Sequence, residues 1–312
     1  MPFPCRPSHV FATQVQGLVA RLKAIKCRDV VLGLSGGLDS TLALLVVDAA
    51  FQKLKLNKRG IHVYTLPGFG TSKRTKTNAT LLCRGLGLKL ETISIVKACR
   101  QHFKDIGHDG RTTDITYENA QARMRTLILM DKANMTGGIV IGTGDLSEIA
   151  LGWSTYNGDH MSMFAVNNGV PKTVIRKVCA WWAEEKVKSK SEKVKGIAAR
   201  AILDIIATPV SPELVKGQVT EDKIGPYELH DFFLWNFIQN EMGSKDLQRT
   251  AEQYFRGTFA AETIRKTLQI FLRRFFTQAF KRNCQPDGIR VFPFELSLRG
   301  WWIPSDLGPI RI

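Results

Sequence analysis

Short apolar runs alternate with longer amphipathic stretches through the first two-thirds of this 312-residue chain. The apolar runs predict β-strands at residues 30–34, 61–66, 91–95 and 138–142. The stretches between them, at 40–54, 75–86 and 118–134, place apolar residues at helical spacing. This alternation is typical of a parallel sheet with helices on its faces. We therefore predict an α/β fold with a doubly wound parallel sheet.

The remainder of the chain has no further strand signal. Beyond about Pro171, residues 226–239 and 262–280 read as helices packed on or beside the sheet. We predict a single domain over residues 1–312, with a lead-in helix in 1–29 and a mainly helical part over about 171–312. The charged run EEKVKSKSEKVK at 184–195 is interpreted as a solvated helix face or a linker rather than a nucleic-acid contact. Gly87, after Leu86, is expected to end a helix.

Composition limits the class of protein and its partners. The chain is 44% hydrophobic and carries 44 Lys and Arg against 28 Asp and Glu, a net charge of +16 that attracts phosphates on nucleotides or nucleic acids. The six cysteines are far apart, which predicts reduced thiols rather than a zinc or iron–sulfur site. No apolar run approaches the roughly 18 to 20 residues of a membrane helix, and the start lacks a secretory signal. We expect a cytoplasmic protein without a membrane partner.

The segment VVLGLSGGLDST at 30–41 carries the strongest chemical signal. A buried strand runs into Ser-Gly-Gly, and a helix begins directly afterwards, so backbone N–H groups and a helix N-terminus converge where an anion binds. No lysine follows the glycines, so this is not the GxxxxGK[ST] loop of kinases and GTPases. Asp39 offers a carboxylate suited to Mg²⁺. The pattern predicts a phosphate-binding loop.

The SGGxDS pattern resembles the signature of the ATP pyrophosphatases, also called the PP-loop superfamily. Longer motifs resemble the synthetase domain of the glutamine-dependent NAD⁺ synthetases, and the resemblance extends from about Gln16 to Asp306. These motifs are LPGFGTS at 66–72, DITYENAQAR at 114–123, GTGDLSE at 142–148, LGWSTYNGDHMS at 151–162, VPKT at 170–173, GPYELHDFF at 225–233 and QAFKR at 278–282. The resemblance implies an adenine nucleotide alpha hydrolase-like, Rossmann-like fold with extra C-terminal helices.

The resemblance also implies a reaction. In that family ATP adenylates the nicotinate carboxylate of deamido-NAD⁺ (nicotinic acid adenine dinucleotide) and releases diphosphate, and ammonia then displaces AMP to form the amide. The enzyme is a ligase that forms a C–N bond, with ATP as co-substrate and Mg²⁺ as the metal. Such chemistry needs phosphate binding, charge neutralisation and orientation more than a protein nucleophile.

Site residues follow from the same resemblance, position by position. It implies Mg²⁺ ligation by Asp39 and Glu148 and catalytic roles for these two, for Lys172 and for Asp159, the last steering or deprotonating ammonium. The implied ATP-binding residues are Gly33, Leu34, Ser35, Gly36, Gly37, Leu38, Asp39, Ser40, Thr143, Lys172 and Thr208. The implied deamido-NAD⁺-binding residues are Asn119, Arg123, Glu148, Trp153, Ser154, Thr155, Tyr156, Asp159 and Lys281.

Several of these residues have simpler interpretations when taken alone. Trp153 and Tyr156 are typical core residues as well as candidates for stacking on the pyridine ring. Asp159 in Asn-Gly-Asp is typical of a turn, and Asn119 of a helix cap. The surrounding motifs favour the binding roles. The histidines show no metal-ligand spacing and are interpreted as structural, with His230 in packing or a subunit contact.

The chain departs from the family pattern in three places. The family's glutamine-dependent members carry an N-terminal amidase domain of the nitrilase type, for which the roughly thirty residues before the loop leave no room. Ammonia would then be free or come from a separate glutaminase, or the chain is an excised domain. The segment after Leu214 is shorter than usual, and SLRGWW at 297–302 replaces the usual SPRGDW.

Two rival functions remain open from the sequence. One is another PP-loop ATP pyrophosphatase, such as a tRNA-modifying enzyme, although the absence of CxxC and of a tRNA-binding module argues against a nucleic-acid partner. The other is a catalytically silent nucleotide-binding partner. The resemblance further implies a homodimer or a larger homo-oligomer.

Overall fold

A five-stranded, wholly parallel sheet forms the centre of the computed structural model, which describes residues 3–188, 195–211, 214–215, 217, 219–297 and 300. The strand order is β3-β2-β1-β4-β5, so the chain moves outward from β1 in one direction and then in the other. This order places a switch point between β1 and β4. The strands are β1 (Val30–Gly33), β2 (Ile61–Thr65), β3 (Leu90–Thr92), β4 (Ile139–Gly142) and β5 (Phe164–Ala165).

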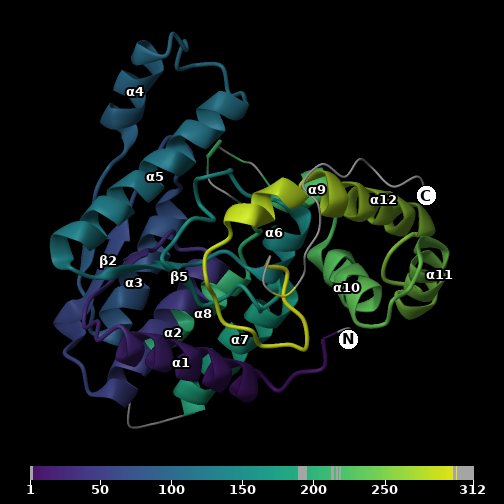
Figure 1. The fold of residues 1–312 in the computed structure, drawn as a ribbon, viewed down its shortest axis with the longest axis horizontal. Coiled ribbons are helices and arrows are strands. Elements are labelled where there is room, and N and C mark those ends of the chain that lie inside the picture. Colours follow the sequence, from purple (N-terminus) through teal and green to yellow (C-terminus); the bar gives the residue numbers. More distant parts are fainter. Residues whose placement is uncertain are drawn as a thin grey trace.

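Helices cover both faces of the sheet, which confirms the predicted doubly wound α/β class (Figure 1). In β1, Val30 and Leu32 belong to the larger core, whereas Val31 points to a second core on the opposite face. The larger core is shared with α1 (Pro7–Ala24), α2 (Leu38–Leu54), α3 (Lys73–Leu86), α7 (Lys172–Lys188) and α8 (Lys195–Ile206), and the second with α4 (Val96–Asp105) and α5 (Ile115–Thr136).

The later part of the chain forms a helical layer beside the sheet, at the right of Figure 1. α10 and α12 contact both each other and α6, which follows β4. The sequence predicts α10 and α12 but not the shorter helices around them. The elements are α6 (Leu146–Leu151), α9 (Thr220–Ile224), α10 (Tyr227–Ile238), α11 (Ser244–Tyr254) and α12 (Ala261–Thr277), with the 3₁₀ helices η1 (Lys58–Gly60) and η2 (Ala279–Cys284).

Some element boundaries differ from those expected. The third strand ends at Thr92 rather than at residue 95, and α12 ends at Thr277, where a 3₁₀ helix takes over. The two-residue strand β5 is not predicted, because a two-residue pattern shows no alternation. The predicted stop after Leu86 is confirmed: Gly87 has φ +67° and caps α3. A Cβ on Gly85 would overlap the backbone of Ala198, so α8 packs directly on this glycine.

Three sequence features fall partly or wholly outside the described residues. In the charged run 184–195, only the residues up to Lys188 are placed within α7. In the segment after Leu214, residues 216 and 218 are not described, nor are 298–299 and 301–312 near the C-terminus.

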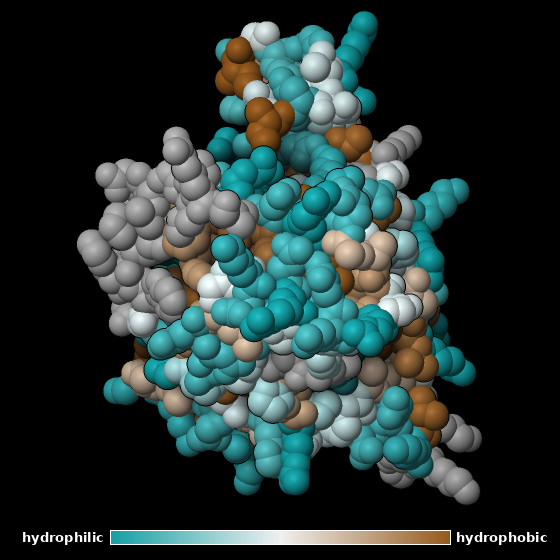
Figure 2. Space-filling view, turned by 90° about the vertical axis from the view of Figure 1, so that its right-hand side faces the viewer, coloured by the Kyte–Doolittle hydropathy of each residue, from teal (hydrophilic) through white to brown (hydrophobic). Residues whose placement is uncertain are grey.

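Among the helices that are described, none is both long enough and apolar enough to cross a membrane. Figure 2 shows the side of the molecule on which α10–α12 lie, and its surface is mainly hydrophilic with scattered apolar residues.

His230, on α10, is a packing residue in this structure. Its side chain is buried, and Nε2–H donates a hydrogen bond of 2.8 Å to the carbonyl oxygen of Ile224. Burial lowers the pKa of His230 to about 4, although the bond to Ile224 opposes this shift. The ring is therefore neutral in the folded protein at neutral pH.

This burial predicts a loss of stability in mild acid. The unfolded chain takes up a proton at His230 near its ordinary pKa of about 6.5, whereas the folded chain does so only near 4. The free energy of unfolding should therefore fall by about 2 to 3 kcal/mol more in the wild type than in His230→Gln between pH ~7 and ~4.5. Urea unfolding at the two pH values measures this, with the exposed His102→Gln as control. Parallel losses in wild type and His230→Gln would contradict the prediction.

Candidate active site

The loop between β1 and α2 has the geometry of an anion-binding site. Gly36 adopts φ +85°, and a Cβ there would overlap the carbonyl oxygen of Thr75. The Gly37 N–H donates to Ser35 Oγ at 3.0 Å, and Ser35 Oγ lies 3.0 Å from Ser40 Oγ. Helix α2 begins at Leu38 and aims its N-terminus at the same place. Backbone N–H groups and hydroxyls thus surround the position expected for phosphate.

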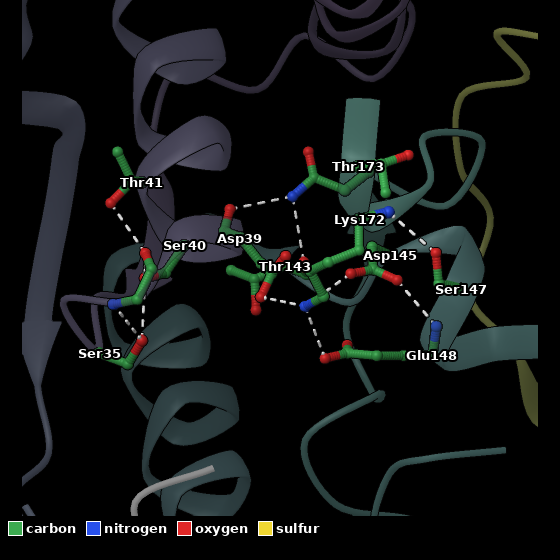
Figure 3. A network of polar contacts seen from close by, with 12 residues as sticks. Ser35, Asp39, Ser40, Thr41, Thr143, Asp145, Ser147, Glu148, Lys172 and Thr173 are labelled. Carbon is green, nitrogen blue, oxygen red and sulfur yellow. Dashed lines mark hydrogen bonds and ion pairs between the residues drawn. The ribbon is translucent and has the colours of Figure 1, made fainter. Parts of the chain in front are cut away.

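Lys172 lies at the centre of a buried cluster of charges (Figure 3). Its Nζ is 2.7 Å from Asp39 Oδ2, 2.7 Å from Asp145 Oδ2 and 2.9 Å from Glu148 Oε1. The Lys172 side chain is only 2% exposed and that of Asp145 0% exposed. One lysine therefore faces three carboxylates, which leaves an excess of negative charge when all four groups are ionised.

The cluster is assembled from three parts of the fold. Asp39 comes from the first turn of α2, Glu148 from α6 and Lys172 from the first residue of α7. Asp145 caps α6, since its Oδ1 accepts a 2.8 Å hydrogen bond from the Glu148 N–H. Asp39 follows the carboxyl end of β1, and Asp145 and Glu148 follow that of β4, on either side of the topological switch point, while Lys172 follows β5.

Burial and mutual charge shift the pKa values of the cluster. Burial alone lowers the pKa of Lys172, but Asp145, Asp39 and Glu148 outweigh it and raise that pKa well above its ordinary value. Burial raises the pKa of Glu148 to about 7 and also raises that of Asp145, while Lys172 opposes both shifts. Lys172 therefore stays protonated. Its single positive charge is too small to neutralise all three carboxylates when they are ionised.

Asp231 holds the backbone around Lys172. It is fully buried on α10 and accepts hydrogen bonds from the Thr173 N–H at 2.9 Å and the Thr173 hydroxyl at 2.6 Å. Ser147 donates its hydroxyl to the other Asp231 oxygen and accepts the Lys172 N–H at 2.9 Å. These bonds satisfy the first N–H groups of α7. α10 thus fixes the start of α7 and with it the Lys172 side chain.

The carboxylates fit a divalent cation. Asp39, Asp145 and Glu148 each offer an oxygen, and the three atoms lie within 4.8 Å of one another. Asp39 Oδ1 is buried and has no hydrogen-bond partner among the described residues. Carboxylate oxygens are the protein ligands that Mg²⁺ prefers. Asp39 and Glu148 are among the predicted ligands and Asp145 is not, although its place between a strand and a helix, three residues before Glu148, is a usable signal.

The phosphate loop and the charge cluster open on one cavity of about 530 Å³, a size suited to a small-molecule ligand. Most of the residues that the resemblance assigned to a ligand line this cavity. They are Gly33, Leu34, Ser35, Gly36, Gly37, Leu38, Asp39, Ser40, Asn119, Thr143, Glu148, Trp153, Ser154, Thr155, Asp159, Thr208 and Lys281. Lys172 does not line the cavity itself, but its side chain contacts Asp39 and Glu148, which do.

Hydrogen bonds hold the loop after α6 against α5. The Thr155 hydroxyl donates to Asn119 Oδ1 at 2.8 Å, and the Thr155 N–H donates to Asp159 Oδ1 at 2.7 Å. Asp159 therefore forms the turn contact that its Asn-Gly-Asp context suggested, while also lining the cavity. Its role toward ammonium stays a prediction.

Two cations stabilise the same loop from the helical layer. Lys281 Nζ donates to the carbonyl oxygens of Gly152 at 2.9 Å and Ser154 at 2.7 Å. The Arg274 guanidinium lies 4.8 Å from the centre of the Trp153 ring and covers one face of it. Arg274 lines the cavity and was not among the predicted site residues.

Arg123 and Tyr156 are predicted site residues that do not line the cavity. The Arg123 guanidinium donates to the Tyr156 carbonyl oxygen at 3.2 Å, and Tyr156 is 38% exposed. Thr208 does line the cavity, and its hydroxyl donates to the Asp204 carbonyl oxygen at 2.8 Å. The ligand contacts of all three stay predictions.

Comparison with known proteins decides the family. A family model described as NAD synthase matches residues 10–271, which is more than half of the chain. The chain belongs to the NAD synthase family. Its members are ligases that form a C–N bond, which sets aside the tRNA-modifying alternative.

One similar curated protein is the glutamine-dependent NAD(+) synthetase of Mycobacterium leprae (strain TN). It is 39% identical over 325 residues, a match that covers 94% of this chain and 47% of the relative. The chain therefore spans about half the length of the curated relatives it matches.

Solved structures of NAD synthetases share the fold. A glutamine-dependent NAD(+) synthetase from Cytophaga hutchinsonii has a TM-score of 0.74 at 18% identity, covering 95% of this chain and 53% of that one. The NH3-dependent NAD synthetase from Campylobacter jejuni has a TM-score of 0.52 at 20% identity, covering 67% and 99%. At these identities the similarity establishes the architecture, and the site must be argued from this chain's own residues.

Proposed function

We propose that this NAD synthase family chain catalyses the ATP-dependent amidation of deamido-NAD⁺ to NAD⁺, with release of AMP and diphosphate. One observation carries the proposal: the phosphate loop, the carboxylate cluster and the Trp153–Asp159 loop line a single cavity. A loop for triphosphate, acidic groups for a metal and a separate polar wall are the parts needed to adenylate a bound carboxylate.

Each part has a distinct role in this proposal. The loop around Gly36 binds the β and γ phosphates and orients the α phosphate toward the nicotinate carboxylate. Asp39, Asp145 and Glu148 would hold Mg²⁺, which supplies positive charge to the phosphates. Lys172 keeps its proton and holds these carboxylates in place. Asp159 receives or orients the incoming ammonium.

The nitrogen source is part of the proposal and is open to direct test. The similar proteins named above include two glutamine-dependent enzymes and one NH3-dependent enzyme. This chain's cavity contains groups for the amidation step, so we propose that it takes up ammonia, either free or released by a glutaminase. A homo-oligomer remains a proposal from the family resemblance.

The proposed reaction predicts NAD⁺ formation from deamido-NAD⁺, ATP, Mg²⁺ and ammonium, measured by chromatography. Asp39→Asn should lower the rate at least about 100-fold, because it removes a charge from the metal-binding set. It should leave the fold intact, as judged by circular dichroism. Product with glutamine alone would contradict the ammonia assignment.

A matched control separates this effect from a general loss of charge. Asp29 is a carboxylate just before β1 that pairs with His62 at 2.9 Å and does not line the cavity. Asp29→Asn should retain nearly full activity. Undiminished activity in Asp39→Asn would overturn the metal assignment, and absence of product in the wild type with ammonium would overturn the proposed function.

A further inference from the structure

Cys284 and His160 lie in contact beside the cavity and take part in none of the steps proposed above. Cys284 ends the 3₁₀ helix η2 and is partly exposed. Its Sγ lies 3.2 Å from Nε2 of His160, which lines the cavity. The other ring nitrogen, Nδ1, lies 2.9 Å from the carbonyl oxygen of Thr155.

The Thr155 carbonyl decides which ring nitrogen carries the proton. A carbonyl oxygen can only accept a hydrogen bond, so Nδ1 must be the protonated nitrogen. In the neutral ring Nε2 then presents its lone pair to the Cys284 thiol at 3.2 Å, the shorter of two acceptors for the S–H, the other being the Lys281 carbonyl oxygen at 3.5 Å. Burial lowers the pKa of His160, with Lys281 adding to this shift and Asp159 opposing it, so the ring is neutral at physiological pH.

This arrangement is that of an activated thiol. A nucleophile lies within hydrogen-bond reach of a base, and a third group orients the base. An ordinary free thiol is only a few per cent thiolate at neutral pH, and an adjacent proton acceptor increases its effective nucleophilicity. Two separate contacts, Cys284–His160 and His160–Thr155, therefore define the site rather than the cysteine alone.

None of the other five cysteines, all within the described residues, forms a hydrogen bond to a histidine or a carboxylate there. Burial raises the pKa of the Cys83 thiol to about 12 and also raises those of Cys99 and Cys5. Cys179 is buried too. Cys27 is partly exposed like Cys284, but its S–H donates to the Asp29 carbonyl oxygen at 3.0 Å, which cannot take up a proton. Cys27 is thus the internal control for Cys284.

We propose that Cys284 and His160 form a reactive thiol–imidazole pair whose substrates are small electrophiles, with hydroperoxides as the class. His160 Nε2 takes the S–H proton, and Sγ attacks one oxygen of hydrogen peroxide. The O–O bond breaks, and the leaving hydroxide takes the proton back from His160. The products are a cysteine sulfenic acid and water.

Modification of Cys284 should change the positions of residues that line the cavity, because Cys284 contacts one of them, His160, directly. An oxygen on Sγ displaces the bond to His160, whose other nitrogen holds Thr155. In the same 3₁₀ helix, Lys281 holds the carbonyl oxygens of Gly152 and Ser154. The loop that carries the candidate deamido-NAD⁺ contacts should therefore shift. This consequence rests on the proposed function, whereas the reactivity of the thiol does not.

Alkylation rates test the thiol pair directly. The full chain is treated with limiting iodoacetamide at pH ~7, and peptide mass spectrometry follows all six cysteines. Cys284 should react at least about tenfold faster than Cys27, and His160→Asn should remove this advantage while His102→Asn keeps it. Equal rates for Cys284 and Cys27 in the wild type would overturn the proposal without any variant having to fold.

Hydrogen peroxide tests the chemistry and its effect on the cavity. Dimedone should trap a sulfenic acid at Cys284, and failure to trap one there would overturn the hydroperoxide assignment. Peroxide should reduce NAD⁺ formation by the wild type but spare Cys284→Ser, and equal inactivation of both would overturn the coupling. If untreated protein forms no NAD⁺, the proposed function fails, while the labelling result still decides the thiol pair.

Discussion

Replacing Lys172 with methionine should both abolish NAD⁺ formation and destabilise the protein in the absence of metal. Methionine is an unbranched side chain one atom shorter than lysine and carries no charge, so Asp39, Asp145 and Glu148 would face one another without their buried counter-ion. Breaking a buried ion pair by removing one partner costs roughly 3 to 5 kcal/mol, because the remaining charges stay buried and uncompensated. Urea unfolding without Mg²⁺ measures this loss.

Magnesium should rescue part of that loss. A cation that binds the folded state stabilises it in proportion to the logarithm of its concentration. Three carboxylates without Lys172 bind a divalent cation more strongly, so Mg²⁺ should raise the unfolding temperature of Lys172→Met more than that of the wild type. The control is Lys188→Met on the same helix, where the side chain is 72% exposed and its ion pair with Glu185 is solvated. A Lys172→Met protein with wild-type stability and no response to Mg²⁺ would contradict the cluster.

Gly36→Ala should be the most damaging small substitution in the phosphate loop. At φ +85° an L-residue is strained by roughly 1 to 2 kcal/mol, and the added Cβ would overlap the carbonyl oxygen of Thr75 in α3. Backbone cannot move aside as a flexible side chain can. We expect the free energy of unfolding to fall by about 3 kcal/mol and ATP binding, measured by calorimetry, to be lost.

Gly37→Ala provides the matched comparison. Gly37 has φ −91°, which any residue adopts, and an added Cβ would meet only Ser35 Oγ at 3.2 Å. Its free energy of unfolding should change by less than about 1 kcal/mol. Equal stability of the two variants would show that the Gly36 conformation is not required, and would remove the geometric argument for the phosphate loop.

The sequence alone predicted four of the five strands, the long helices that follow β1, β2 and β3, and the loop proposed to bind phosphate. All are local in origin: apolar periodicity predicts each element, and Ser-Gly-Gly between a strand and a helix N-terminus is a contiguous signal. The family resemblance, rather than periodicity, implied Asp39 and Glu148 as metal ligands. Periodicity missed β5, which is too short to show a period, and α8, whose close packing on Gly85 depends on a distant segment.

Only the tertiary structure decided which charged side chains of the site contact one another. Asp145 caps α6, yet the fold also brings it to Lys172, and Asp231 from α10 holds the start of α7. The motifs also imply ligand contacts for Lys281, Arg123 and Tyr156. In the structure Lys281 donates a hydrogen bond to the Gly152 carbonyl oxygen, and Arg123 donates one to the Tyr156 carbonyl oxygen. Motif spacing identifies residue types near a site, but the partner of a long side chain lies between 24 and 133 residues away, and only packing brings the two together.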